Sequence, residues 1–210
     1  MRKAILGLML SLALTHAAPT LGAVVRADEP RPKRIVPCEL NPEDYAVYSA
    51  ILDDLGRPED PEEEWRGRAE MVLADRTVYY SGAGGAWGFR SNSKQAPLPQ
   101  TVTNFEARVK SVCTVQPLFT SKLSPRIVSS VEISDFFKKK GDGWEGFYRK
   151  YPKSSGYWAF SPVGYSNDSL EALVYVDHSC GYLCGTGHLV LLEKENGAWI
   201  VKNRVMLWIS

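Results

Sequence analysis

The sequence predicts an α+β fold in which one N-terminal helix packs on a curved antiparallel sheet. Residues 41–56 repeat apolar side chains at helical spacing, which predicts one amphipathic helix. Residues 157–209 contain four segments rich in β-branched and aromatic residues, which are typical of strands. Consecutive strands joined by short turns indicate a meander, and a helix covering one face of such a sheet is an α+β arrangement.

The predicted N-terminal helix has start and stop signals as well as an apolar face. Asn41 is a suitable N-cap and Pro42 fits the first helical position. Two acidic residues follow, which favours the positive end of the helix dipole. Gly56 marks the expected end of the helix. The apolar face consists of Tyr45, Tyr48, Ile51, Leu52 and Leu55.

The remaining elements are predicted from local composition and turn residues. Strands are expected over residues 70–80, 126–133, 157–165, 169–178, 188–194 and 198–209. Short helices are expected over residues 103–112 and over residues 134–140, the second capped by Ser134. The Asn196-Gly197 pair predicts a two-residue hairpin turn, because Asn-Gly readily adopts the positive φ angles that such turns require.

The N-terminal end of the sequence predicts export. Arg2 and Lys3 precede an apolar run, and small residues follow it near Ala27, as in a secretory signal peptide. The alternative is a retained membrane anchor, but polar residues and a proline leave the run shorter than the roughly 18 apolar residues of a spanning helix. We therefore expect a signal peptide at 1–27, an extended lead-in at 28–40 and a single domain at 41–210, located in the periplasm or secreted.

Four cysteines remain after removal of such a leader: Cys38, Cys113, Cys180 and Cys184. An even number of cysteines in an exported chain favours disulfide bonds. Four cysteines allow three pairings, of which the local one joins Cys180 to Cys184 and leaves Cys38 for Cys113. The sequence alone leaves these pairings open.

Two of these cysteines lie in the stretch DHSCGYLCGTGH, residues 177–188, for which three interpretations compete. The favoured one is a glycine-rich turn held by a disulfide. A metal site would use His178, Cys180, Cys184 and His188, but their spacing is not a usual zinc pattern. One hairpin register also cannot place the two cysteines opposite each other and the two histidines opposite each other. The third interpretation is a labile redox pair, although C-x3-C in a turn differs from the C-x2-C that begins a helix.

Charge and motifs exclude several classes of function. The chain has 25 basic and 24 acidic residues, and removal of Arg2, Lys3 and Arg26 leaves 22 against 24, a net charge near −2. This balance argues against a nucleic-acid partner. No hydrolase, nucleotide-binding or cofactor motif is present, so no cofactor and no catalytic residue is predicted. A hydrolytic alternative would combine His178 or His188 with Asp177 or Glu193 and a serine such as Ser161 or Ser179.

Aromatic side chains give the best sequence-based candidates for a binding surface. Residues 81–100 are rich in Gly, Ser and Pro and predict a loop that contains Trp87 and Phe89. A second group of aromatic residues, between Trp144 and Phe160, includes Tyr157. Tyr and Trp are frequent anchors at protein interfaces, so Trp87, Phe89 and Tyr157 are the predicted binding residues. Most of the second group is expected to fill the core.

The chain also resembles an uncharacterised family of secreted bacterial proteins. The matching segments are YAVYSAIL, VLADRT, FYRKYPKSSGYWAFSPVGYS, ALVYV, CGYLCGTGHLVLLEK, NGAWIV and the final WIS. The resemblance implies export and gives no residue a role. The helix-and-sheet outline is similar to cystatin-like and NTF2-like folds in shape only. We expect a non-catalytic exported domain that binds a protein, a peptide or an envelope component, without a stable membrane anchor after leader cleavage. The alternative is a small envelope enzyme, hydrolytic or thiol-redox, that uses the His178–His188 region.

Overall fold

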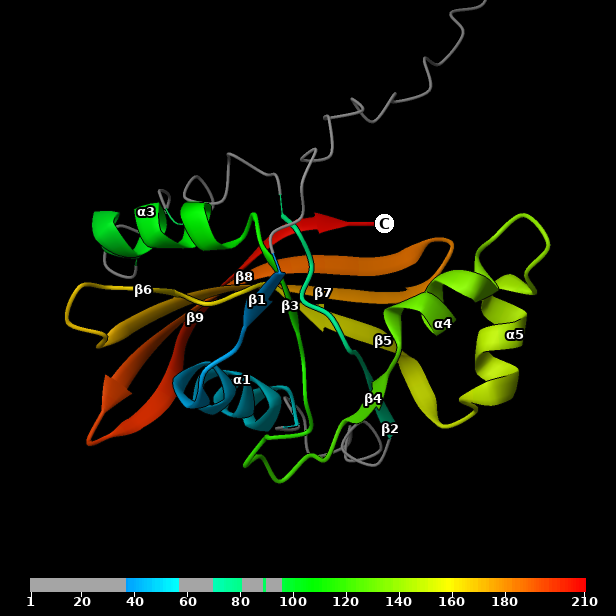
Figure 1. Ribbon diagram of the computed structural model, residues 1–210, viewed down its shortest axis with the longest axis horizontal. Coiled ribbons are helices and arrows are strands. Elements are labelled where there is room, and N and C mark those ends of the chain that lie inside the picture. The colour runs from blue at the N-terminus through cyan, green and yellow to red at the C-terminus, as the bar shows by residue number, and fades with distance from the viewer. Residues whose placement is uncertain (1–36, 57–69, 81–88, 90–95) are drawn as a thin grey trace, which may run out of the picture. The chain divides into compact units, whose positions relative to one another are not determined.

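The computed structural model describes residues 37–56, 70–80, 89 and 96–210, which all belong to one compact unit. It confirms the α+β class: the described residues form four helices around a mixed sheet of seven strands (Figure 1). The helices are α1 (Pro42–Leu55), α3 (Pro99–Arg108), α4 (Ser130–Phe136) and α5 (Gly143–Lys150). The predicted leader at 1–27 lies outside the described residues.

The main sheet combines a parallel half and an antiparallel half. Its order is β4-β2-β5-β7-β8-β9, and the short strand β6 also pairs with β7. The antiparallel meander of β7, β8 and β9 is confirmed, whereas β2 pairs in parallel with both β4 and β5, which the sequence analysis did not predict. The strands are β2 (Glu70–Ala74), β4 (Arg126–Val128), β5 (Ser154–Phe160), β6 (Gly164–Tyr165), β7 (Glu171–Gly181), β8 (Cys184–Glu195) and β9 (Ala198–Ile209).

The turn between β8 and β9 has the predicted geometry. Asn196 has a φ of 50° and Gly197 a φ of 84°, so both central residues occupy the left-handed region. Turns of this kind match the right-handed twist of the strands that they connect. The turn therefore fixes the pairing of Glu195 with Ala198, from which the β8–β9 ladder extends.

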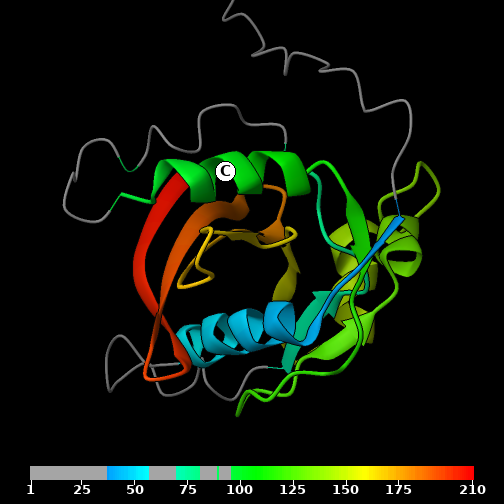
Figure 2. The same cartoon turned by 60° about the vertical axis from the view of Figure 1, so that its left-hand side comes forward.

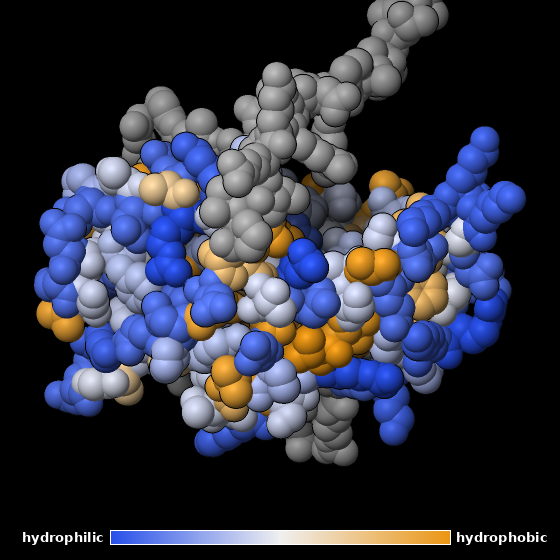
Figure 3. Space-filling model, viewed as in Figure 1, coloured by the Kyte–Doolittle hydropathy of each residue, from blue (hydrophilic) through white to orange (hydrophobic). Residues whose placement is uncertain are grey.

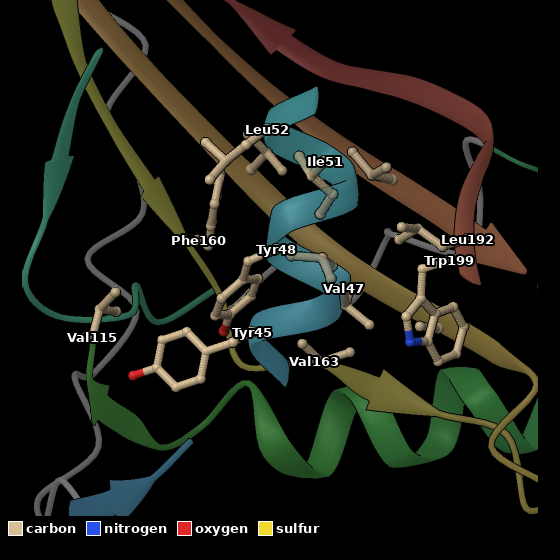
Figure 4. Packing of buried hydrophobic residues seen from close by; sticks show 14 of the residues in the cluster. Tyr45, Val47, Tyr48, Ile51, Leu52, Val115, Phe160, Val163, Leu192 and Trp199 are labelled. Atoms are coloured by element: carbon tan, nitrogen blue, oxygen red, sulfur yellow. The ribbon is translucent and has the colours of Figure 1, made fainter. Parts of the chain in front are cut away.

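Helix α1 begins and ends where its sequence signals predict. The side chain of Asn41 accepts a hydrogen bond from the Asp44 N–H, and the Asp44 carboxylate accepts one from the Asn41 N–H, each at 3.0 Å. Such a capping box satisfies two backbone donors that the first helical turn leaves unpaired. Gly56 follows the last helical residue. The apolar face of α1 packs on the sheet around Tyr48, whose ring lies 5.1 Å from that of Phe160 (Figure 4).

Strands β7 and β8 are covered on both faces, by α1 on one side and by α3 on the other (Figure 2). Side chains alternate between the faces of a strand, so residue parity decides which helix each one meets. Even-numbered side chains pack with α1 and odd-numbered ones with α3. The first set includes Ala172, Val174, Val176, Val190 and Leu192, and the second includes Leu173, Tyr175, Leu189 and Leu191.

A third apolar cluster joins α4 and α5 to the parallel half of the sheet. Phe147 of α5 and Tyr151, the residue that follows α5, pack there with Ile133 of α4 and with buried side chains of β2, β4 and β5. The predicted strand over residues 126–133 is wrong at its end, because only Arg126–Val128 is extended and α4 begins at Ser130. The N-cap is Ser129 rather than the predicted Ser134, and its hydroxyl accepts a hydrogen bond from the Val131 N–H.

The carboxylate of Asp44 joins three elements although its side chain is completely buried. One oxygen accepts a hydrogen bond from the Tyr165 hydroxyl of β6 at 2.9 Å. The other lies 3.3 Å from the Arg108 guanidinium of α3 and also accepts the Asn41 N–H. Burial, together with the Asp44 charge, raises the pKa of Tyr165, so this hydroxyl stays protonated and keeps donating. Hydrogen bonds and an ion pair thus offset the desolvation of the buried charge.

We expect Asp44→Ala to lower the free energy of unfolding by about 3 kcal/mol, because it removes a buried carboxylate that pairs with Arg108 and also removes half of the capping box. Urea denaturation monitored by circular dichroism measures the change. The control is Glu106→Ala on the exposed surface of α3, which should change stability by less than about 0.5 kcal/mol. Equal effects of the two substitutions would contradict the central role of Asp44.

Candidate functional site

All four cysteines form disulfides, and the local pairing considered from the sequence is confirmed. Cys180 is bonded to Cys184, with a Cα–Cα distance of 5.0 Å. Cys38 is bonded to Cys113, with a Cα–Cα distance of 4.5 Å, across the parallel strands β1 (Pro37–Glu39) and β3 (Val112–Thr114). Structural disulfides persist in oxidising compartments, so the pairings indicate a protein of such a compartment. None of the described helices is long and apolar enough to cross a membrane.

The second disulfide closes the tip of the β7–β8 hairpin, residues 180–184, which we call the hairpin tip. Val176 lies opposite His188 and His178 opposite Thr186, so the histidines do not face each other. The register then shifts between Ser179 and Gly181, which places Gly181 opposite Cys184. The turn itself consists of Tyr182 and Leu183. DHSCGYLCGTGH is thus a hairpin turn held by a disulfide.

The two turn residues are the most exposed large hydrophobic side chains of the described part of the chain. Leu183 is 88% exposed and Tyr182 is 80% exposed, whereas the next, Ile209, is 69% exposed. The face of the molecule seen in Figure 3 is mainly hydrophilic, with separate hydrophobic areas. The two side chains are adjacent on one turn, so together they form a small exposed apolar surface at the hairpin tip.

Residues of α5 and β5 contact the hairpin tip and the strand that leads to it. The Tyr148 hydroxyl of α5 donates a hydrogen bond to the Cys180 carbonyl at 2.7 Å. Gly156 of β5 has a φ of 109°, and a Cβ atom there would lie 2.2 Å from the Ser179 carbonyl oxygen. Only glycine allows this close approach of β5 to β7. The tip is therefore fixed by its disulfide, by a hydrogen bond and by direct backbone packing.

Aromatic rings of α5 and β5 stack on one another close to the hairpin tip, which Tyr148 contacts. The Trp144 ring is stacked with Tyr148 at 5.7 Å and with Tyr157 at 5.8 Å, and the Phe137 ring packs edge-on against it at 4.9 Å. Burial raises the pKa of Tyr148 and of Tyr157, so both hydroxyls remain neutral. Tyr157, a predicted binding residue, is thus half-buried and mainly supports the stack.

Of the other two predicted binding residues, the structure describes Phe89. Phe89 is completely buried in the apolar cluster between α3 and the sheet. Trp87 lies outside the described residues, so its role stays a prediction. The sequence analysis missed Tyr182 and Leu183, although two large apolar residues between two cysteines of a hairpin turn were a usable signal.

His178 lies on the α1 face of β7 in a fixed position. Its ring is stacked on Trp158 with 3.9 Å between ring centroids, and its Nε2 lies 2.8 Å from the Ser155 carbonyl oxygen. Burial lowers the pKa of His178. His188 lies on the same face, and burial, then the Arg204 charge and then His178 lower its pKa. Both rings are therefore predominantly neutral near pH 7.

The structure does not bring the candidate hydrolytic residues together. Asp177 points to the opposite face of β7 from His178 and accepts a hydrogen bond from the Tyr175 hydroxyl at 2.9 Å. The Ser161 hydroxyl is completely buried and accepts the Tyr175 N–H, while the Ser179 hydroxyl donates to Asp177. Glu193 pairs with Glu171 in the β7–β8 ladder, far along it from His188. The hydroxyls of Ser161 and Ser179 therefore have partners other than His178 and His188.

The metal alternative loses two of its four ligands, because Cys180 and Cys184 are bonded to each other and offer no thiolate. Within the described part of the chain, no group of three or more His, Cys, Asp and Glu side chains is arranged to hold an ion.

Comparison with protein-family models, with curated proteins and with solved structures finds no match for this chain.

The neutral histidines predict a pH dependence of stability. The pKa of each histidine is 6.5 in the unfolded chain and lower in the folded chain. As the pH falls below about 7, the unfolded chain therefore binds more protons than the folded chain does. The free energy of unfolding should fall between pH 7 and pH 5. The double variant His178→Phe/His188→Gln should show a smaller fall, measured by urea denaturation at several pH values. An equally steep fall in this variant would assign the effect to other groups.

Proposed function

We propose that this chain is an exported, non-catalytic binding domain that contacts its partner through the hairpin tip. The leader-like residues 1–27 and the two disulfides support a secreted or periplasmic location. The observation that carries the proposal is the exposure of Tyr182 and Leu183 on a backbone that the Cys180–Cys184 bond holds fixed. The partner is a protein, a peptide or another component of the envelope.

A fixed backbone favours binding because less conformational entropy is lost on association. Rotamer-rich side chains each cost about 0.5–1.5 kcal/mol when they are immobilised at an interface, and loop ordering adds to this. The Cys180–Cys184 bond already restricts the backbone of the hairpin tip in the free protein. Tyrosine is enriched among the residues that dominate binding energy, since it offers a large rigid surface and a hydroxyl. Leu183 beside it extends the apolar contact.

The positions of the histidines favour binding over catalysis. A general base must be in hydrogen-bond reach of the proton that it takes, but His178 is stacked on Trp158 and engaged with the Ser155 carbonyl. The carboxylate next to it in sequence, Asp177, lies on the other face of the strand. The enzyme alternative, hydrolytic or thiol-redox, would need these groups to rearrange.

The test is a comparison of immobilised variants exposed to an extract of the native compartment. We expect the variant Tyr182→Ser/Leu183→Ser to retain at least about tenfold less of the bound partner than the wild type does, because the two anchor side chains are removed. The matched control is Leu118→Ser, which changes a 56% exposed leucine elsewhere on the surface. Quantitative mass spectrometry measures each bound component.

A second arm separates binding from catalysis. The variant His178→Phe/His188→Gln, which keeps an aromatic ring against Trp158, should bind as the wild type does. If no component depends on the hairpin tip, the proposed contact is wrong. If the purified wild type hydrolyses or oxidises a substrate and the histidine variant does not, the enzyme alternative replaces the proposal.

A further inference from the structure

We propose that thiol–disulfide exchange at Cys180–Cys184 controls the order of the hairpin tip, while the Cys38–Cys113 bond stays intact. The proposal rests on the proposed function in one respect only, since the tip matters to a partner only if it is the contact. The two disulfides then have different roles: Cys38–Cys113 stabilises the domain, whereas Cys180–Cys184 is a reducible bond, called the clasp below, that orders the hairpin tip.

The two disulfides differ in the access that they give to an attacking thiolate. Cys184 is exposed and is the first residue of β8, directly after the two-residue turn. Cys113 is completely buried, and its N–H donates a hydrogen bond to the Thr77 hydroxyl at 2.8 Å. Because exchange requires a thiolate to reach a sulfur atom, access favours attack at Cys184.

The leaving groups differ in the same direction. Attack at partly exposed Cys38 would release Cys113 as a thiolate in a buried apolar position, where desolvation disfavours the charge. Attack at Cys184 releases Cys180, which is only half-buried. A lower cost for the departing thiolate speeds exchange, so both steps select the tip disulfide.

The reaction balances with a dithiol as the reductant. A thiolate of the dithiol attacks the Cys184 sulfur, the Cys180–Cys184 bond breaks, and the Cys180 thiolate takes a proton. The second thiol of the reductant then attacks the sulfur atom that the reductant contributes to the mixed disulfide. Cys184 leaves as a thiolate and takes a proton. The protein gains two electrons and two protons, and the reductant leaves as a disulfide.

Reduction should loosen the tip without unfolding the domain. The β7–β8 ladder from Glu171 to Ser179 and the whole β8–β9 ladder do not depend on the Cys180–Cys184 bond. A disulfide across a loop of this length restricts the open state by about 30-fold in the loop-entropy model. Tyr182 and Leu183 would therefore sample many positions in the reduced protein, and binding would again require their ordering.

The experiment treats the folded, purified wild type with increasing dithiothreitol, followed by alkylation and peptide mass spectrometry. We expect Cys180 and Cys184 to be labelled at least about tenfold faster than Cys38 and Cys113. Hydrogen exchange measured by mass spectrometry should show about 30-fold lower protection confined to residues 180–184. The variant Cys180→Ser/Cys184→Ser, which cannot form the clasp, should match the reduced wild type in the absence of dithiothreitol.

Two outcomes would overturn the inference: equal labelling of both pairs, or unchanged protection of the hairpin tip after its cysteines are labelled. Neither measurement involves a partner, so both are independent of the proposed function. Conversely, selective labelling with no tip-dependent binding partner would support the clasp and contradict the proposed contact. If the serine variant fails to fold, labelling and exchange on the wild type alone still decide the question.

Discussion

Burial of β7 and β8 on both faces is the constraint on which the rest of the structure depends. Even-numbered side chains require one apolar cover and odd-numbered ones another, so α1 and α3 must lie on opposite sides of the sheet. The Asp44 carboxylate, held between α1, α3 and β6, joins the two covers directly. Past the ends of these helices the same hairpin continues, and there it carries Tyr182 and Leu183 into solvent.

The parts of the fold that were predictable have local causes. The capping box at Asn41, the stop at Gly56 and the Asn196-Gly197 turn each depend on a few adjacent residues. The parallel pairing of β2 with β4 and β5 was not predictable, because it joins short segments that are distant in sequence. The start of α4 was missed for a related reason: β-branched residues continue past Val128 into the helix, and only Ser129 marks the change.

The candidate site shows the same division between local and non-local information. Pairing of Cys180 with Cys184 was one of the options from sequence spacing, and the period of two along β7 separates Asp177 from His178 without any knowledge of the fold. Burial of Phe89 could not be foreseen, since it depends on α3 packing over a distant part of the sheet. Exposure of Tyr182 and Leu183 likewise depends on how far the hairpin extends beyond both helices.

The bond between Cys38 and Cys113 has a mechanical consequence for the domain. It ties the strand that precedes α1 to β3, and β3 is itself bound to the residues after β2, where the Thr77 N–H donates to the Cys113 carbonyl. A load applied through the chain before Cys38 passes along a covalent path into this part of the domain. This covalent path does not include α1. A force applied through the chain before Cys38 would therefore leave the packing of α1 against the sheet undisturbed.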